Sequence, residues 1–455
     1  MQSSRSVRAG RRPLDIQLIL VVLLLGLLWV AGGASRGDVM GQPVVRGGCW
    51  AIVAAAILAG PRPALDGARW LPWLLVATIA LPLLQLVPLP PAWWQALPGR
   101  EVLLVPGDAP PWRPLTMTPG ATRNALASLI VPATMLLLLA QGGERLRAAM
   151  PGLLLAFITA AVLVGLVQFT GARFNHPFVN DTAGQISGIF ANRNHFALLI
   201  AMGCALAPPW AFADREALRW RGPLAAGLIV LFVLTILATG SRAGMLLGVV
   251  GLGAGVALVA RRLRRRLSRA PRWVLPALAL GIVVLIGGAI AASVLADRAD
   301  SVNRLLTLDR AEDVRTRALP TVLGMVAHYM PFGSGFGGFD PVFRIHEPLA
   351  LLKLTYFNQA HNDFLGIALD GGIAGLIVLA AALGWWASAT IAVWRAPADE
   401  AVLRARLGSA MIALVLAASV FDYPARTPIV MALIVVAAWW LAHGSGGRPR
   451  AALPE

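Results

Sequence analysis

The run LDIQLILVVLLLGLLWVAGGA, residues 14–34, decides the class of fold. It is long enough to cross a bilayer, because the hydrocarbon core is spanned by about 20 apolar residues in a helix. The basic start RSVRAGRR, residues 5–12, precedes it, and no small-residue cleavage site follows it. These features predict a retained signal anchor whose N-terminus stays in the cytoplasm.

The whole chain has the composition of a membrane protein. Of its 455 residues, 58% are hydrophobic and 13% are charged, whereas about 25% of the residues of a typical soluble domain are charged. The net charge of +17 does not indicate a nucleic-acid partner, because the basic residues lie in short loops between apolar runs. Cys49 and Cys204 lie in apolar stretches, where we expect small hydrophobic side chains rather than a disulfide or a metal pair.

The apolar runs predict an all-α polytopic membrane protein with about twelve transmembrane helices. The predicted spans are residues 14–34, 45–60, 70–88, 124–140, 149–170, 195–212, 223–239, 243–260, 273–296, 364–394, 407–421 and 428–442.

Loop charges predict the orientation of the chain. With both termini in the cytoplasm, the inner loops and tails hold 23 of the 39 basic residues, whereas the outer side holds nine apart from the seven in the long loop 297–363. This asymmetry follows the positive-inside rule. The spans and this orientation together divide the chain into three predicted regions. These are spans 1–9 within residues 1–296, a mainly helical outer loop at 297–363, and spans 10–12 with a cytoplasmic tail at 364–455. The other long outer loop, residues 89–123, is rich in Pro and Trp, and we expect it to lie along the membrane interface.

Four segments at the predicted outer face carry polar side chains. They are NRNH at 192–195, TGSRAG at 239–244, DRAEDVRTRALP at 309–320 and HNDFLGIALDGG at 361–372. Each has an ordinary alternative interpretation: a capped helix entrance for the first and last, an arginine that reaches lipid phosphates for the second, and a solvated charged helix for the third. Asp370 falls about two turns inside a span. Because an ionisable group is costly there, we expect Asp370 to have a functional or a structural hydrogen-bonding role. Gly371 and Gly372 allow close packing or a break of that helix.

Taken together, the four segments favour an anion-binding site. Arginine binds phosphate oxygens bidentately, so several arginines at one face suit a diphosphate. A neutral histidine beside them can take a proton from an attacking hydroxyl. The sequence has no DxD, HExxH or cysteine ligand set, so neither a metal nor another cofactor is expected.

These segments, in this order, resemble the O-antigen ligase and O-antigen polymerase superfamily of bacterial inner-membrane glycosyltransferases. The matching pieces are NRNHFA at 192–197, SRAG at 241–244, Arg317 followed by a helix and PFGSGFGGF at 331–339, and HNDFLGIALDGGIAGL at 361–376. The resemblance covers roughly residues 185–380 and implies a periplasmic site that uses a glycan carried on undecaprenyl diphosphate.

Carried onto this chain, the resemblance implies roles for individual residues. Arg242 and Arg317, with Arg315 as a possible substitute, would hold the diphosphate and stabilise the leaving group, and His361 would activate the acceptor hydroxyl in an inverting displacement that needs no metal. Further substrate-binding candidates are Arg310, Asn192, Arg193, Asn194, His195, Asn362 and Asp363. Two departures from the family pattern are Asp370, where many relatives have Glu, and Pro320, near the position where relatives often have Trp. Proline can occupy a first helical turn, so the arginine before it can be positioned differently in this chain.

The acceptor stays open between a lipid A core, a growing surface polysaccharide and a protein hydroxyl. A transporter or flippase of a lipid-linked glycan or another anion is the alternative function. Transporters place ionisable groups near the bilayer midplane, and here Asp370 comes nearest to that position. A structural scaffold would leave the clustered arginines and histidines unexplained.

Overall fold

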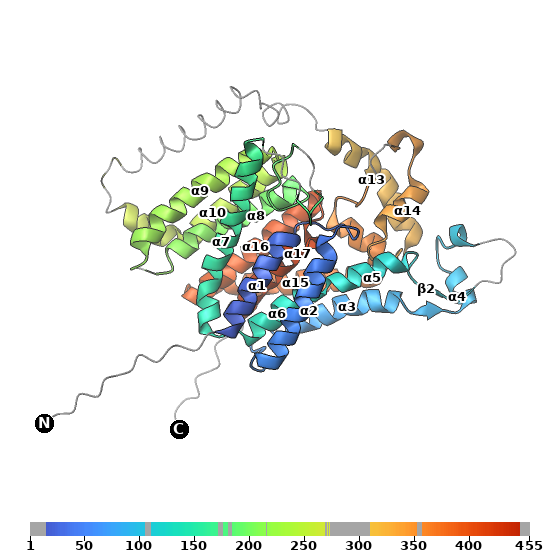
Figure 1. Ribbon diagram of the computed structural model, residues 1–455, viewed down its shortest axis with the longest axis horizontal. Coiled ribbons are helices and arrows are strands. Elements are labelled where there is room, and N and C mark those ends of the chain that lie inside the picture. Colours follow the sequence, from blue (N-terminus) through green and yellow to red (C-terminus); the bar gives the residue numbers. More distant parts are fainter. Residues whose placement is uncertain are drawn as a thin grey trace.

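A computed structural model gives the arrangement of the chain. It describes residues 15–445 with the exception of 105–110, 172–175, 181–183, 215, 269–270, 272, 274–309 and 353–356. The described part is helical apart from one pair of two-residue strands, and most helices form one bundle (Figure 1).

The first half of the bundle follows the chain with short connections. Its helices are α1 (Ile16–Ala31), α2 (Gly41–Ala59), α3 (Trp70–Gln85), α5 (Pro119–Ser128), α6 (Ile130–Gln141), α7 (Glu144–Phe169), α8 (Arg193–Ala211), α9 (Leu218–Thr239) and α10 (Arg242–Leu267). Helices α5 and α6 meet at Leu129 and together form one candidate span, residues 119–141, where the span 124–140 was predicted. Pro132 accounts for the break, because it lacks a backbone N–H and its ring clashes with the carbonyl of residue 128.

The second half contains the helices of the segment before α15 and the last three long helices. These are α13 (Arg310–Tyr329), α14 (Phe339–His346), the 3₁₀ turn η2 (Leu349–Leu351), α15 (Asp363–Arg395), α16 (Glu400–Phe421), the 3₁₀ turn η3 (Pro424–Arg426) and α17 (Pro428–Ser445). The described part of the predicted outer loop 297–363 is therefore mainly helical. Pro320 lies in the middle of α13, not in a first turn, because the helix begins ten residues before it.

The described helices establish a polytopic membrane protein. Eight of them are long and apolar enough to cross a membrane: α2, α5 with α6, α7, α9, α10, α15, α16 and α17. Helices α1 and α3 are apolar but shorter, with 16 residues each. Helix α8 has 19 residues and lies almost wholly inside the bundle. The predicted ninth span, 273–296, lies outside the described residues.

Helices α8 and α10 pack against each other more closely than ordinary side chains allow. A Cβ on Gly251 would lie 2.3 Å from the carbonyl oxygen of Ala201, and one on Gly255 would lie 2.6 Å from that of Ala205. Glycines of this kind let two helix backbones approach in a membrane. The close packing places the N-terminal ends of α8 and α10 side by side.

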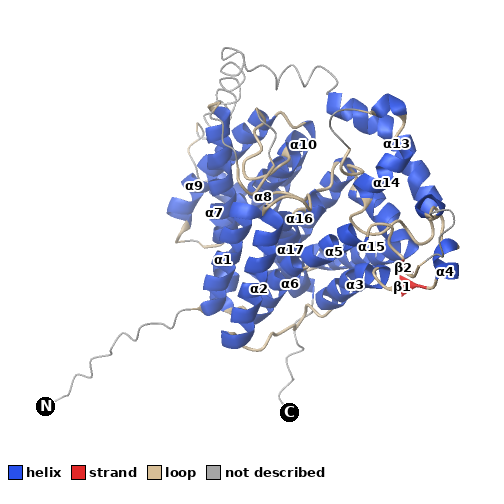
Figure 2. Cartoon of the chain, turned by 45° about the vertical axis from the view of Figure 1, so that its right-hand side comes forward, coloured by secondary structure: helices blue, strands red, loops and turns tan. Residues whose placement is uncertain are grey.

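A smaller unit made of two distant segments lies beside the bundle (Figure 2). One segment contributes α4 (Pro91–Gln95), the 3₁₀ turn η1 (Glu101–Leu103) and the antiparallel strands β1 (Pro88–Leu89) and β2 (Arg113–Pro114). These strands depart from the all-α prediction, because Pro88 and Leu89 pair with a distant segment that local periodicity does not reveal. Helices α13 and α14 form the other segment and share a hydrophobic core around Met325, Tyr329 and Phe343.

A turn rich in glycine, residues 331–338, connects α13 to α14 and packs against α15. Gly372 interrupts α15 with φ 56°, and the turn satisfies the backbone groups that the break leaves open. The Gly335 N–H donates to the Asp370 carbonyl (3.0 Å), and the Ile373 N–H donates to the Pro331 carbonyl (2.9 Å). Irregular backbone at a membrane protein's core is stable only where protein groups satisfy it in this way. The hydrogen bonds at the break in α15 therefore fix this smaller unit to the bundle.

Candidate functional site

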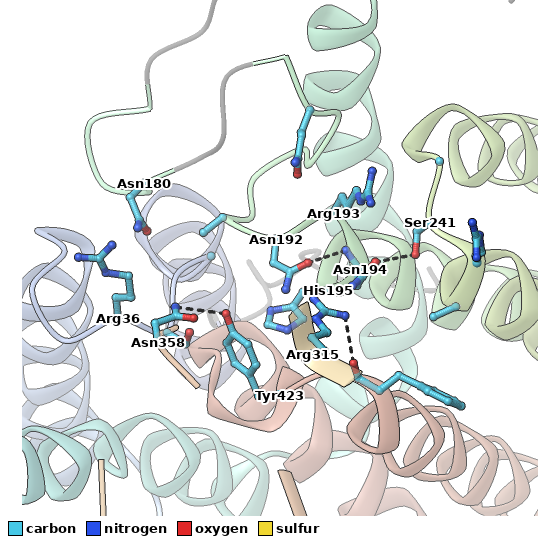
Figure 3. A pocket seen from close by; sticks show the side chains of 18 of the residues that line it. Arg36, Asn180, Asn192, Arg193, Asn194, His195, Ser241, Arg315, Asn358 and Tyr423 are labelled. Carbon is cyan, nitrogen blue, oxygen red and sulfur yellow. Dashed lines mark hydrogen bonds between the residues drawn. The ribbon is translucent and has the colours of Figure 1, made fainter. Parts of the chain in front are cut away.

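A cavity of about 500 Å³ opens where the ends of several helices converge (Figure 3). Its volume lies within the range of small-molecule sites. Its walls come from the segment after α1, the loop before α8, the starts of α8 and α10, helix α13, and the segments that flank α15 and follow α16. The lining residues include Ser35, Arg36, Asn180, Gln185, Asn192, Arg193, Asn194, His195, Ser241, Arg242, Leu246, Arg315, Asn358, Phe421 and Tyr423.

Two helix N-termini point into this cavity. The Asn192 side chain caps α8 by accepting from the Asn194 N–H (2.8 Å), and the Ser241 hydroxyl caps α10 by accepting from the Gly244 N–H (2.9 Å). The Ser241 hydroxyl also donates to the side-chain oxygen of Asn194 (2.8 Å), which ties the two caps together. Gly240 provides the left-handed residue (φ 62°) that the tight connection from α9 requires. Because helix N-termini carry partial positive charge, this pair favours an anion.

Four arginines line the cavity. Arg193 and Arg242 are the first residues of α8 and α10, so the two caps fix their positions. Arg315 enters from α13 and donates to the Phe421 carbonyl (3.3 Å), and Arg36 enters from the segment after α1. Among the described residues that line this cavity, none is Asp or Glu. Arg36 is paired with Asp38, so the excess positive charge of the described lining comes from Arg193, Arg242 and Arg315.

Behind the cavity wall, Asp422 connects the converging segments. It lies between α16 and α17 and is 2% exposed. Its Oδ2 accepts hydrogen bonds from the side-chain amides of Asn192 (2.9 Å) and Asn194 (2.7 Å). Its Oδ1 lies 3.1 Å from His361 Nδ1, and its Oδ2 lies 3.7 Å from an Arg315 nitrogen. One buried carboxylate thus holds groups from α8, α13 and the start of α15.

The environment of Asp422 keeps its carboxyl ionised. Burial alone would raise the pKa of Asp422, but the hydrogen bond with His361 and the positive groups around it outweigh burial and hold the pKa well below its usual range. Burial lowers the pKa of His361, and the hydrogen bond with Asp422 opposes this effect. At neutral pH, His361 is therefore neutral and donates its Nδ1 proton to Asp422, which leaves Nε2 as an acceptor.

The two histidines near Asp422 differ in access. The His195 side chain is 3% exposed, its Nδ1 lies 3.1 Å from the Thr427 hydroxyl, and its Nε2 lies 3.9 Å from Asp422 Oδ1. The His361 side chain is 14% exposed and is not among the residues that line the cavity. It lies behind Tyr423, which does line the cavity, with ring centroids 4.9 Å apart. His361 also has φ 49°, a strained conformation for a residue other than glycine.

Arg317, Asn362 and Asp363 are not among the residues that line the cavity. The Arg317 side chain donates to the Ala350 carbonyl (3.2 Å) in η2. Asn362 caps α15 and donates to the Val420 carbonyl (3.0 Å). Asp363 accepts from the Ser419 hydroxyl (2.8 Å) and the Ala425 N–H (3.1 Å), so it holds the segment after α16. Arg310 begins α13, and its side chain lies outside the described part of the structure.

Asp370 belongs to a buried joint rather than to the cavity. Its Oδ2 accepts from Arg426 (3.1 Å) and from the Gly337 N–H (3.2 Å). A Cβ on Gly371 would lie 2.8 Å from the Phe336 ring, and one on Gly372 would lie 2.2 Å from the Pro331 carbonyl oxygen. The predicted break and close packing of this helix are both present, at Gly372 and Gly371 respectively.

Sequence reasoning missed Asp422, Tyr423, Arg426, Asn358 and Arg36. The first three belong to the short segment DYPAR, residues 422–426, between the last two predicted spans. The topology placed this segment on the same face as the four motifs. One signal could have identified Asp422: it is an acidic residue that directly follows a long apolar run at the predicted outer face.

Part of the chain matches a known protein family. Residues 227–380 match the family described as O-Antigen ligase. The matched stretch runs from α9 into the first half of α15 and contains Arg242, Arg315 and His361, whereas the NRNH segment precedes it. No curated protein matches the chain. This polytopic membrane protein therefore carries a domain of the O-antigen ligase family.

Proposed function

We propose that the protein transfers a glycan from undecaprenyl diphosphate to an acceptor hydroxyl at the periplasmic face of the bacterial inner membrane. The observation that carries this proposal is the cavity itself, where Arg193, Arg242 and Arg315 converge with two helix N-termini, while Asp38 offsets the charge of Arg36 at the edge. A diphosphate needs this concentration of donors, since each charge-assisted hydrogen bond contributes about 1.5–3 kcal/mol.

The proposed reaction is a direct displacement at the anomeric carbon. The acceptor oxygen attacks the face opposite the diphosphate, the bond from the anomeric carbon to the phosphate oxygen breaks, and the configuration inverts. The negative charge that develops on the leaving diphosphate meets Arg242 and Arg315, so the arginines stabilise the transition state more than the substrate. Because His361 does not line the cavity, the hydroxyl proton passes to its Nε2 through one intervening water beside Tyr423, while Asp422 holds the ring through Nδ1.

The wall formed by α10 suits a substrate with a lipid tail. Leu246, one turn after Arg242, lines the cavity and is 59% exposed. Val249 and Val250 continue the same face of the helix and are also exposed. A polyprenyl chain lying along this stripe would stay among membrane lipids while its diphosphate enters the cavity.

In this proposal the chain crosses the membrane twelve times with both termini in the cytoplasm. The cavity then opens to the periplasm, where glycans on undecaprenyl diphosphate are presented in the outer leaflet. The acceptor is a lipid A core, a growing polysaccharide or a protein, and the protein acts in the biosynthesis of a surface polysaccharide or glycoconjugate.

The test is a transfer reaction with purified protein in lipid nanodiscs, undecaprenyl-diphosphate glycan and candidate acceptors, without ATP. We expect a new glycoside and an equal amount of released carrier diphosphate. Arg242→Ala and His361→Ala should abolish both, while Arg344→Ala, which removes an exposed pair with Asp340 on α14, should not. If the lipid instead crosses proteoliposome membranes and no glycoside forms with any acceptor, the protein is a transporter and the proposal is wrong.

A further inference from the structure

A second cavity of about 320 Å³ lies beside the first. The segment after α1 forms one wall with Arg36, Asp38 and Val39, and the loop after α7 forms the other. That loop contributes His176, Pro177, Val179 and Asn180. Arg36 and Asn180 line both cavities, so a ligand in the second cavity would meet a ligand in the first across these two side chains (Figure 3).

The two cavities differ in charge. In the second, Arg36 Nε donates to Asp38 Oδ1 (2.9 Å), and this bond lowers the pKa of the Asp38 carboxyl. The carboxylate therefore stays ionised and offsets the charge of Arg36. An anionic ligand would meet a negative group here, whereas a neutral ligand rich in hydroxyls would find both donors and acceptors.

Backbone contacts hold the segment after α1, which forms one wall of the second cavity, against the loop that leads into α8. The Ala191 N–H donates to the Gly33 carbonyl (3.1 Å), and a Cβ on Gly33 would lie 1.7 Å from the Ile189 carbonyl oxygen. The segment after α1 is thus fixed against the loop that leads into α8. On the other wall, the Phe178 N–H donates to His176 Nδ1 (3.2 Å), and Val179 is 4% exposed.

We infer that the second cavity binds a saccharide acceptor and presents one of its hydroxyls to the donor across Arg36 and Asn180. This inference rests on the proposed transfer reaction, in which the first cavity holds the donor diphosphate. Asp38 would accept hydrogen bonds from sugar hydroxyls, and Arg36, held by Asp38, would donate to them. The acceptor class is then a neutral sugar of a glycan rather than a protein side chain.

The experiment compares Asp38→Asn with Asp340→Asn in the transfer reaction. The control removes a similar Arg–Asp pair on α14, away from both cavities. The acceptor probes are the core oligosaccharide and the repeat-unit oligosaccharide prepared from the bacterium that carries the gene, with a protein acceptor from the same cells. We expect Asp38→Asn to raise the KM for the saccharide at least about tenfold. The KM for the donor should change less than about twofold, and Asp340→Asn should change neither.

Donor binding, measured separately by titrating undecaprenyl-diphosphate glycan without an acceptor, keeps the two proposals distinguishable. If the wild type binds donor and forms glycoside but Asp38→Asn leaves the saccharide KM unchanged, the second cavity is not the acceptor site. Equal increases in donor and acceptor KM overturn the inference in the same way, because Asp38 would then act on the donor. Transfer only to the protein acceptor also overturns it. If the wild type forms no glycoside with any acceptor, the proposed function itself fails.

Discussion

Arg315 and Arg317 stand two residues apart on α13, so their side chains leave the helix about 200° apart. Only one of them can face the cavity, and Arg315 lines it while Arg317 donates to the Ala350 carbonyl. The sequence left open which of the two arginines binds the diphosphate, because the direction of each depends on how α13 packs against α15. That packing is a tertiary property, and no local pattern encodes it.

The first prediction separates these two arginines. We expect Arg315→Ala to lower kcat/KM for glycan transfer by about 10- to 100-fold, because it removes a charged donor from the cavity. Arg317→Ala should retain most of the wild-type value, as it loses a bond to η2 outside the cavity. Both variants are measured in the same transfer reaction after their thermal unfolding temperatures are compared. A larger loss for Arg317→Ala would contradict this assignment, because the diphosphate would then bind at the face of α13 that carries Arg317.

Asp422 supports a second prediction, which concerns pH. If His361 is the base, transfer requires its neutral form, and because its pKa is lowered, the acidic limb of kcat/KM should lie below 6.5. Asp422→Asn removes the hydrogen bond and charge that oppose this lowering. We therefore expect the limb to move to still lower pH while kcat falls by about 100-fold or more. A pH profile with an unmoved limb would leave Asp422 with a purely structural role.

Asp422 and His361 both make the folded protein less stable as the pH falls. The pKa values of Asp422 and His361 are both lower in the folded protein than their ordinary values of 3.8 and 6.5. The unfolded chain therefore binds more protons in acid, and the stabilisation they provide is present at neutral pH and lost as the pH falls through the folded values. Thermal unfolding in detergent should occur at a lower temperature at pH 4 than at pH 7, mainly because of His361, since the Asp422 contribution is lost only below about pH 4. Asp422→Asn should not reduce this difference, because it removes the interactions that oppose the lowering of the His361 pKa.

At the scale of single elements, α15 shows what the sequence could and could not predict. The pair Gly371 and Gly372 indicated a break or close packing, and both occur. The groups that fill the break come from residues 331–338, and Gln85 of α3 donates to the Asp370 carbonyl (2.8 Å). Pairings across 35 to 285 residues leave no local trace. The helix and its interruption were therefore predictable, and the joint was not.

The third prediction tests this joint with two glycines of the same helix. In Gly372→Ala, a Cβ would lie 2.2 Å from the Pro331 carbonyl oxygen on a residue with φ 56°. We expect a clear fall in the thermal unfolding temperature and in the yield of monodisperse protein, since backbone atoms must move. In Gly384→Ala, no atom lies within 4 Å of the new Cβ, and alanine favours a helix. The control should match or exceed wild-type stability, and equal behaviour of the two variants would argue against the break.

For the whole molecule, hydropathy predicted the architecture and charge predicted its orientation, while the site depended on how the ends of α8, α10, α13 and α16 converge. The start of α1 and the end of α17 lie at the same end of the bundle, away from α13 (Figures 1 and 2). This agrees with two termini on one side of the membrane and an outer unit on the other. Which side is the cytoplasm follows only from the loop arginines.

The last prediction tests this orientation with single cysteines. Cys49 and Cys204 are buried, so a membrane-impermeant maleimide should report mainly on introduced residues. Leu349→Cys lies in η2 and replaces a side chain that is 86% exposed, and Ala398→Cys lies in the exposed connection between α15 and α16. In intact spheroplasts we expect labelling of Leu349→Cys alone. In inverted membrane vesicles we expect labelling of Ala398→Cys alone. The reverse pattern would show that the cavity opens to the cytoplasm. The site could then not reach a donor in the outer leaflet, and the proposed reaction would be wrong even if every arginine were essential for activity.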